Sequence, residues 1–239
     1  MVRAKKSLSQ NFLTDKNISK KIINLTNIKN KNILEIGAGY GFMTDEILKQ
    51  HPRNIILIEK DFNLIKFLNE KYKKFKNVII IEEDILKFDL KDFKNLIIIS
   101  NLPYNVSTKI ILYLFQYYKN INEMIFMIQK EVAVKFDYNL PKMNKYKFMT
   151  KIVSNYNICF DVSPKVFKPK PKVTSSVVKF KINKKNFNLI KANNFSKNIF
   201  KNVRKMIYNN IKINCKHKLL NKRVNELTIN ELLSIYNLF

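Results

Sequence analysis

Short runs of apolar, often β-branched residues alternate along the first 130 positions with longer segments that carry apolar residues at helical spacing. This alternation is typical of strand–helix–strand units that build a parallel sheet. The runs are almost continuously apolar, as expected for strands covered by helices on both faces. The expected strands are residues 32–37, 54–60, 77–84, 95–100 and 123–129, and the expected helices are residues 42–50, 61–74 and 107–118.

The pattern changes in the C-terminal half of the chain. Two further strand-like runs, 157–163 and 175–182, flank a proline-rich loop and are consistent with a closing hairpin. From about Asn183 onward only helix-like segments follow. We therefore predict an α/β fold with a Rossmann-like sheet over residues 1–182 and a small all-helical domain over residues 183–239.

Glycine is confined to one place. The chain has three glycines in 239 residues, and Gly37, Gly39 and Gly41 all follow the first expected strand, in ILEIGAGYGFMT (33–44). Glycine tolerates positive φ and lets the backbone approach a ligand closely, and a strand–turn–helix unit offers free N–H groups there. Tight turning alone is the alternative. A dinucleotide motif needs a small residue at Phe42, so the G-x-G-x-G spacing favours S-adenosylmethionine, whose amino-acid part can lie along the turn.

Acidic residues end the next two strands. Glu59 lies 22 residues after Gly37, near the offset at which an acid accepts both ribose hydroxyls. Asp84, followed by Ile85, ends the third strand and is placed to accept from the adenine amine of the cofactor. Either acid by itself is more often a solvated strand end, but the carboxyl ends of parallel strands meet in the crevice where such sheets bind ligands.

The fourth strand ends in Asn101-Leu102-Pro103-Tyr104. The Asn101 side-chain oxygen and the Leu102 backbone carbonyl can accept the two N–H groups of an adenine amine, which directs the nitrogen lone pair at a methyl donor. Tyr104 can stack on the base, so positioning and electrostatics would carry the rate. The structural alternative is a proline turn that leads into a helix capped by Ser107 or Thr108.

A target base must leave its stack to enter such a pocket. The stretch VFKPKPKV (166–173) supplies Phe167, which can hold the base on the side opposite Tyr104; hydrophobic packing is the alternative role. Three lysines in the same loop are expected to meet backbone phosphates, namely Lys168, Lys170 and Lys172.

The charge supports a nucleic-acid partner. Lysine and arginine number 45 against 18 acids, and residues 162–225 hold 18 basic residues and no acid. Compositional bias toward Lys, Asn and Ile explains part of the excess of basic residues. It does not explain why 64 consecutive residues contain no Asp or Glu. Two distant cysteines suit a reducing compartment, and neither a signal peptide nor a membrane span is apparent, so we expect a cytoplasmic protein without bound metal.

Five stretches together resemble the small-subunit rRNA adenine N6,N6-dimethyltransferases. They are SQNFLTD (9–15), ILEIGAGYG (33–41), NLPYNVST (101–108), MIQKEVAVK (127–135) and VFKPKPKVTSSVV (166–178). Residues 195–211 and 222–233 look like that family's helical C-terminal domain. The resemblance covers nearly the whole chain and implies a class I methyltransferase sheet.

The resemblance also implies roles for individual residues. Asn11 and Leu13 would line the cofactor's site, and Asn101 would serve both cofactor and target. Lys201, Arg204 and Lys205 would contact rRNA. The substrate would be two adjacent adenines in the 3′-terminal hairpin of small-subunit rRNA, each methylated twice, in a partly assembled subunit. We expect a monomer.

Three other functions compete with this one. A large-subunit rRNA methyltransferase of the antibiotic-resistance type shares the chemistry but usually reads Asn-Ile-Pro-Tyr. A DNA adenine methyltransferase normally has a second proline where Leu102 stands. A non-catalytic rRNA-binding assembly factor would not need an intact Asn101–Tyr104 motif, so assembly is better taken as a second role.

Overall fold

The computed structural model describes residues 11–185, 187–211 and 217–239. The strands are β1 (Phe12–Leu13), β2 (Asn32–Ile36), β3 (Asn54–Glu59), β4 (Val78–Glu82), β5 (Leu96–Asn101), β6 (Ile121–Gln129), β7 (Ser154–Val162), β8 (Phe167–Lys168) and β9 (Ser175–Ile182). The α-helices are α1 (Lys16–Ile23), α2 (Phe42–Leu48), α3 (Phe62–Tyr72), α4 (Ser107–Phe115), α5 (Lys130–Phe136), α6 (Lys145–Val153), α7 (Leu189–Ile199) and α8 (Ile229–Leu238). All seven predicted strands and three predicted helices are confirmed, with small differences at their ends.

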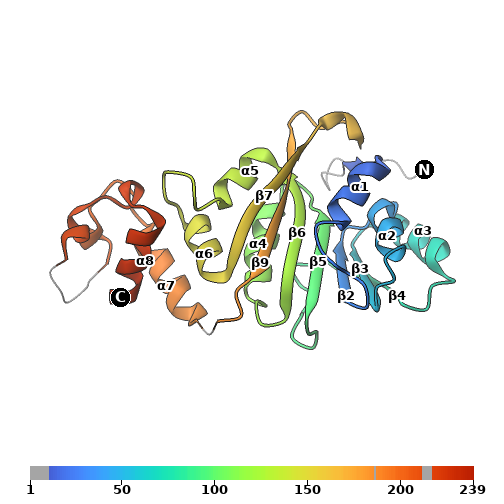
Figure 1. The fold of residues 1–239 in the computed structure, drawn as a ribbon, viewed down its shortest axis with the longest axis horizontal. Helices are drawn as coiled ribbons and strands as arrows, with labels where there is room; N and C mark the ends of the chain where they lie inside the picture. Colours follow the sequence, from blue (N-terminus) through green and yellow to red (C-terminus); the bar gives the residue numbers. More distant parts are fainter. Residues whose placement is uncertain (1–10, 186, 212–216) are drawn as a thin grey trace. The chain divides into compact units, whose positions relative to one another are not determined.

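Seven strands form one sheet in the order β4-β3-β2-β5-β6-β9-β7 (Figure 1). The pairs β3–β4, β2–β3, β2–β5 and β5–β6 are parallel, whereas β9 runs antiparallel to β6. β9 also neighbours β7, which confirms the predicted closing hairpin. Because the parallel strands are in register, the carboxyl ends of β2, β3 and β5 lie together at one edge.

The strands form because their side chains are almost all apolar and become buried. Isoleucines and one methionine from five neighbouring elements join a single core cluster; they include Ile22 and Ile23 of α1, Ile33 of β2, Ile55 of β3, Ile97 of β5 and Met127 of β6. Burial of one such side chain stabilises the fold by about 1.5–3 kcal/mol. Turns elsewhere use asparagine in the left-handed region instead of glycine, as at Asn30 and Asn95, with φ of 58° and 55°.

The chain divides into two compact units. One comprises the residues up to Ala133 together with Ile158–Ile182, and the other comprises Val134–Asn157 together with Asn183–Phe239. The boundary predicted after residue 182 is one of the three points at which the chain passes between them. All four strand ends with predicted cofactor-binding residues, those of β2, β3, β4 and β5, belong to the first unit.

The second unit has an aromatic core. The Phe148 ring on α6 lies 5.1 Å from that of Phe195 on α7 and 5.4 Å from that of Tyr236 on α8. Thr228 and Glu231 form a capping box that starts α8. Between α7 and α8 the described residues form 3₁₀ turns (Ile207–Asn209, Lys218–Asn221 and Val224–Glu226), with one isolated bridge between Met206 and Arg223.

Candidate active site

A crevice lies at the carboxyl ends of β2, β3 and β5. It consists of two adjoining cavities, both open to solvent, with about 530 and 540 Å³ of empty space when the adjoining solvent is included. The first is lined by Asn11, Phe12, Gly37, Gly39, Glu59, Lys60, Leu64, Asn101, Leu102, Pro103 and Tyr104. The second shares Gly37, Glu59, Lys60 and Pro103 with it and adds Asp84, Ile85, Asn105 and their neighbours. Residues predicted separately from four strand ends thus surround one crevice.

The glycine turn joins β2 to α2 with every glycine at positive φ, between 58° and 76°. The Gly37 N–H donates to the Ile58 carbonyl at 2.8 Å, and the Gly39 N–H donates to Glu59 Oε2 at 3.3 Å. Close packing adds a second requirement for glycine, because a Cβ on Gly39 would lie 2.9 Å from the Phe12 ring. The turn is therefore formed by backbone conformation and covered by the N-terminal strand β1.

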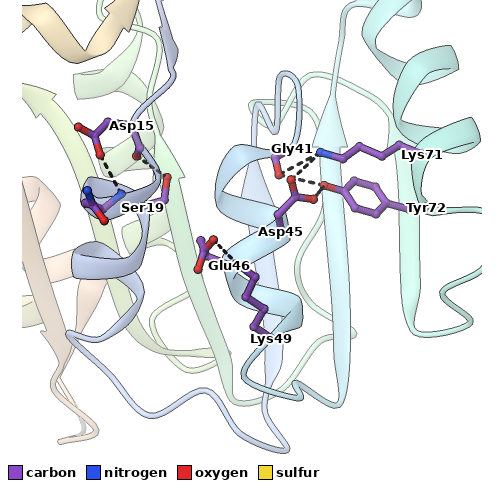
Figure 2. A network of polar contacts seen from close by, with 9 residues as sticks. Asp15, Ser19, Gly41, Asp45, Glu46, Lys49, Lys71 and Tyr72 are labelled. Carbon is purple, nitrogen blue, oxygen red and sulfur yellow. Dashed lines mark hydrogen bonds and ion pairs between the residues drawn. The ribbon is translucent and has the colours of Figure 1, made fainter.

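Lys71 and Tyr72, the last two residues of α3, form hydrogen bonds to the end of this turn and to α2 (Figure 2). Lys71 Nζ donates to the Tyr40 carbonyl and to Asp45 Oδ2, each at 2.8 Å. The Tyr72 hydroxyl lies 2.9 Å from the Gly41 carbonyl and 2.7 Å from Asp45 Oδ1. Burial raises the pKa of Tyr72, so its hydroxyl stays a neutral donor. This arrangement fixes the first residues of α2 without any ligand.

Glu35 is a buried acid beneath the turn, on β2. Its Oε2 accepts from the Thr44 hydroxyl at 2.6 Å, and its side chain is 1% exposed. Burial raises the pKa of Glu35 to about 8, more than the Thr44 hydrogen bond lowers it. Glu35 is therefore protonated at neutral pH, and sequence reasoning did not single it out.

Glu59 stands between the two cavities at the end of β3. Its Oε1 accepts from the backbone N–H groups of Lys60 and Asp61, at 2.9 and 3.0 Å. Burial raises the pKa of Glu59, and its backbone hydrogen bonds act in the opposite direction. Three backbone donors thus orient this carboxylate at the crevice.

Asp84 and Ile85 line the second cavity only. Asp84 Oδ1 accepts from the Leu86 N–H at 3.0 Å, and Oδ2 forms an ion pair with Lys60 Nζ at 3.4 Å. Ile85 is 5% exposed and supplies an apolar wall. The polar and apolar surfaces side by side suit a purine ring with an exocyclic amine.

Asn101 ends β5 and has an unused acceptor. Its Nδ2 donates to the Asn11 carbonyl at 2.8 Å, which orients the amide. Its Oδ1 is buried and has no hydrogen-bond partner among the residues that the structure describes. A buried acceptor without a partner is unfavourable by about 1–3 kcal/mol, so this oxygen is available to accept from a ligand's donor.

The rest of the loop is held at both ends. The Leu102 N–H donates to the Met127 carbonyl at 3.1 Å, and the Tyr104 hydroxyl lies 2.6 Å from Ser175 Oγ. The expected capping of α4 by Ser107 or Thr108 is wrong. Val106 occupies the cap position without a side-chain hydrogen bond, and the Ser107 hydroxyl donates backward to the Tyr104 carbonyl at 3.2 Å.

Some predicted residues lie away from both cavities. Gly41 is one of them, since it lines neither cavity and its carbonyl is bound by the Tyr72 hydroxyl. Leu13 and Phe167 pair with each other in the small β1–β8 sheet and are 4% and 2% exposed, as members of the core cluster. Lys168, Lys170 and Lys172 are exposed, as are Lys201, Arg204 and Lys205. Within the described residues there is no cluster of side chains suited to a metal ion, and no helix there has the length and hydropathy to cross a membrane.

Sequence reasoning missed several lining residues. Phe12 lies between the predicted Asn11 and Leu13, and Lys60 directly follows Glu59, so their positions in the motifs were available signals. Ser175 carried no local signal, because its contact with Tyr104 joins residues 71 positions apart.

The fold is that of the class I methyltransferases. The solved structure of the 23S rRNA methyltransferase ErmE superimposes with a TM-score of 0.79 at 19% identity, over 95% of this chain and 98% of that one. A dimethyladenosine transferase from Plasmodium falciparum gives a TM-score of 0.78 at 22% identity, over 95% and 97%.

Sequence comparison narrows the class to one family. A family model described as ribosomal RNA adenine dimethylase matches residues 1–239. Proteins named ribosomal RNA small subunit methyltransferase A are 39% identical in Malacoplasma penetrans, over 87% of this chain and 78% of the relative, and 35% identical in a Hydrogenobaculum species, over 99% and 94%. The chain belongs to the ribosomal RNA adenine dimethylase family, which confirms the resemblance noted from its motifs.

Proposed function

We propose that this protein uses S-adenosylmethionine to dimethylate the N6 amines of two adjacent adenines in the 3′-terminal hairpin of small-subunit rRNA. Family membership supports the reaction, and the relatives named small subunit methyltransferase A support the substrate. One observation supports the roles proposed for individual residues: Asn101 Oδ1 in the crevice is buried and has no hydrogen-bond partner among the described residues.

The residues present fit the cofactor. The crevice offers a glycine turn, an oriented carboxylate at Glu59, and the Asp84–Ile85 wall. In the proposal, Gly37, Gly39 and Asn11 hold the amino-acid part, Glu59 accepts the ribose hydroxyls, and Asp84 and Ile85 hold the adenine. Gly41 and Leu13 line neither cavity and are proposed to support the cofactor's site from outside it. When bound, the cofactor supplies an electrophilic methyl group on a sulfonium.

The target amine is a poor nucleophile because its lone pair is delocalised into the ring. Asn101 Oδ1 and the Leu102 carbonyl accept its two protons and draw the nitrogen toward a tetrahedral geometry. Tyr104 stacks on the flipped base and holds it in line. Phe167 is proposed to cover the opposite side of the base; contact requires that the side chain leave its buried place beside Leu13.

The basic residues are proposed to bind the rRNA backbone. Lys168, Lys170 and Lys172 follow Phe167 directly, and Lys201, Arg204 and Lys205 lie in an exposed stretch of the second unit. Binding through phosphates releases counterions, so affinity should fall steeply with salt. Measured affinity for small subunits that stays flat between 50 and 200 mM salt would contradict this part of the proposal.

The direct test uses the purified protein, S-adenosylmethionine and small ribosomal subunits that lack these methyl groups. Mass spectrometry of the rRNA 3′ end should find two adjacent N6,N6-dimethyladenosines, and Asn101→Ala should abolish them. Parallel incubation with large subunits and with duplex DNA tests the competing substrates. Methylation confined to either of those would overturn the proposal.

A role in subunit assembly is a separate component of the proposal. The protein is expected to act as a monomer in the cytoplasm, on a precursor of the small subunit. Cells that carry only Asn101→Ala should lose the methylation but keep normal subunit profiles if binding alone supports assembly. Profiles as defective as those of a deletion strain would tie assembly to catalysis instead.

A further inference from the structure

A hydrogen bond of the Tyr104 side chain joins two distant parts of the first unit. Its hydroxyl lies 2.6 Å from Ser175 Oγ, and Ser175 begins β9. β6 lies between β5, which leads to Tyr104, and β9 in the sheet (Figure 1). The bond therefore connects the Asn101–Tyr104 loop to the strand that follows the proline-rich loop.

Ser175 is a firmly held anchor. It is fully buried and pairs with Gln129 at the end of β6. The neighbouring residue adds a second attachment, because the Ser176 hydroxyl donates to Asp161 Oδ1 at 2.6 Å. Asp161 Oδ2 in turn forms an ion pair with Lys130 Nζ at 2.6 Å. The start of β9 is thus tied to its neighbours on both sides, and only Ser175 passes that constraint to Tyr104.

The backbone of Tyr104 is fixed independently, since its carbonyl accepts from the Ser107 hydroxyl at the start of α4. The hydroxyl of Tyr104 lies at the far end of the ring's long axis, so a bond there restricts the tilt of that axis. Burial raises the pKa of Tyr104, which keeps the hydroxyl neutral. Backbone and ring tip together fix the direction of the long axis of the ring on which a base can stack.

We propose that Ser175 is a positioning residue that orients the Tyr104 ring against the target adenine, and that its effect is largest in the second methyl transfer to each amine. The inference rests on the proposed function. In each transfer a C–N bond forms, the C–S bond of the donor breaks to leave a thioether, and the nitrogen releases one proton to water.

The second transfer depends more on stacking for a chemical reason. The unmethylated amine has two N–H groups, one for Asn101 Oδ1 and one for the Leu102 carbonyl. The monomethylated amine has one, so a hydrogen bond that positions the base is lost. The stacking contact with Tyr104 then carries a larger share of the orientation, and a loosely held ring harms this step more than the first.

The test compares two adjacent serines, Ser175→Ala and Ser176→Ala. Both are fully buried and both form a 2.6 Å hydrogen bond, but only Ser175 reaches Tyr104. The ratio of N6-methyladenosine to N6,N6-dimethyladenosine is measured on small subunits at equal total methyl incorporation. This ratio is insensitive to the fraction of protein that is folded, and thermal unfolding is recorded alongside.

Ser175→Ala should slow the second transfer by about 3- to 10-fold relative to the first, since one neutral hydrogen bond corresponds to a factor of about 2 to 13. The monomethyl product should accumulate. Ser176→Ala should lower the melting temperature comparably but keep the product ratio within about twofold of the unsubstituted protein. An unchanged ratio in Ser175→Ala, or an equal shift in Ser176→Ala, would overturn the inference.

A third variant removes the other partner of this hydrogen bond, the Tyr104 hydroxyl, and completes a double-mutant cycle. Tyr104→Phe keeps the ring and removes the hydroxyl, so it should reproduce the product ratio of Ser175→Ala, and the double variant should add nothing further. Additive effects would show that Ser175 acts by another route. If the unsubstituted protein forms no dimethyladenosine on small subunits, the proposed function fails; if it does and the ratio never shifts, only this inference fails.

Discussion

The glycine turn after β2 and the Asn101–Tyr104 loop after β5 lie at the carboxyl ends of neighbouring strands, yet they are built in opposite ways. The turn is satisfied within the protein: Lys71 and Tyr72 bind its carbonyls and Phe12 covers it. The loop keeps one buried acceptor, Asn101 Oδ1, without a partner among the described residues.

The difference separates two tasks. A turn that must present its backbone to a cofactor in every cycle gains from being rigid before the cofactor arrives. A loop that must activate a poor nucleophile needs hydrogen-bonding capacity that only the substrate uses. The first task calls for stability and the second for a local loss of stability, so substitutions in the two regions should affect different measurements.

The largest effect is expected in the loop. Asn101→Ala removes the unpaired acceptor, and loss of one such electrostatic contact lowers kcat by roughly 100- to 1,000-fold. Steady-state kinetics on small subunits measures it, with the melting temperature as control. Because Oδ1 forms no hydrogen bond to any residue that the structure describes, the melting temperature should fall by less than that of Gly41→Ala. A large loss of stability with modest loss of kcat would reverse the comparison.

The turn should respond in stability instead. In Gly41→Ala the new Cβ would lie 2.0 Å from the Tyr72 hydroxyl, at a φ of 76°. Overpacking and backbone strain together are expected to destabilise the protein by about 3 kcal/mol, a drop of about 6–12 °C in melting temperature. Added Tyr72→Phe should recover part of this loss, because the nearest clashing atom is removed while the φ strain remains.

Glu35 lies beneath the same turn, and its titration can be tested by measuring the stability of the protein against pH. Its pKa is raised from 4.5 to about 8, so between these values the folded protein holds a proton that the unfolded chain has released. Stability attributable to Glu35 therefore falls as pH rises through this window, by up to about 1.4 kcal/mol per pH unit. Asp45, Lys71 and Glu59 also act on this carboxyl.

Glu35→Gln keeps an acceptor for Thr44 and removes the titration. The variant should gain about 2 kcal/mol relative to the unsubstituted protein between pH 6 and pH 8, measured by chemical unfolding at each pH. Parallel stability curves for the two proteins over that range would mean that Glu35 is charged in the folded state.

Local pattern predicted the sheet and much of the crevice, because both depend on short-range signals. Apolar runs fix the strands, and residues that end parallel strands of one sheet, such as Glu59 and Asn101 on either side of β2, must lie at one edge. The Tyr104–Ser175 bond and the closure of Gly41 by Tyr72 span 71 and 31 positions. Such contacts follow from how helices and strands pack, which no periodicity encodes. The burial of Phe167 has the same origin, since it depends on pairing with Leu13.

The smallest change in stability is expected at Gly37, and it sharpens the comparison most. Its φ is 67°, but an added Cβ would meet no atom within 4 Å. Gly37→Ala should therefore lose only the backbone term, about 1 kcal/mol or 2–4 °C. The space that the Cβ enters borders both cavities, so calorimetric affinity for S-adenosylhomocysteine should fall at least tenfold.

Gly41→Ala is the matched control for Gly37→Ala. It should lower the melting temperature more and the affinity for S-adenosylhomocysteine less than Gly37→Ala does. Both substitutions add one methyl group to the same turn at positive φ, but only Gly41 is closed off by Tyr72. If Gly37→Ala binds the ligand as tightly as the unsubstituted protein, the turn does not contact the cofactor. The rigidity of the turn would then serve folding alone, and the division of tasks between turn and loop would not hold.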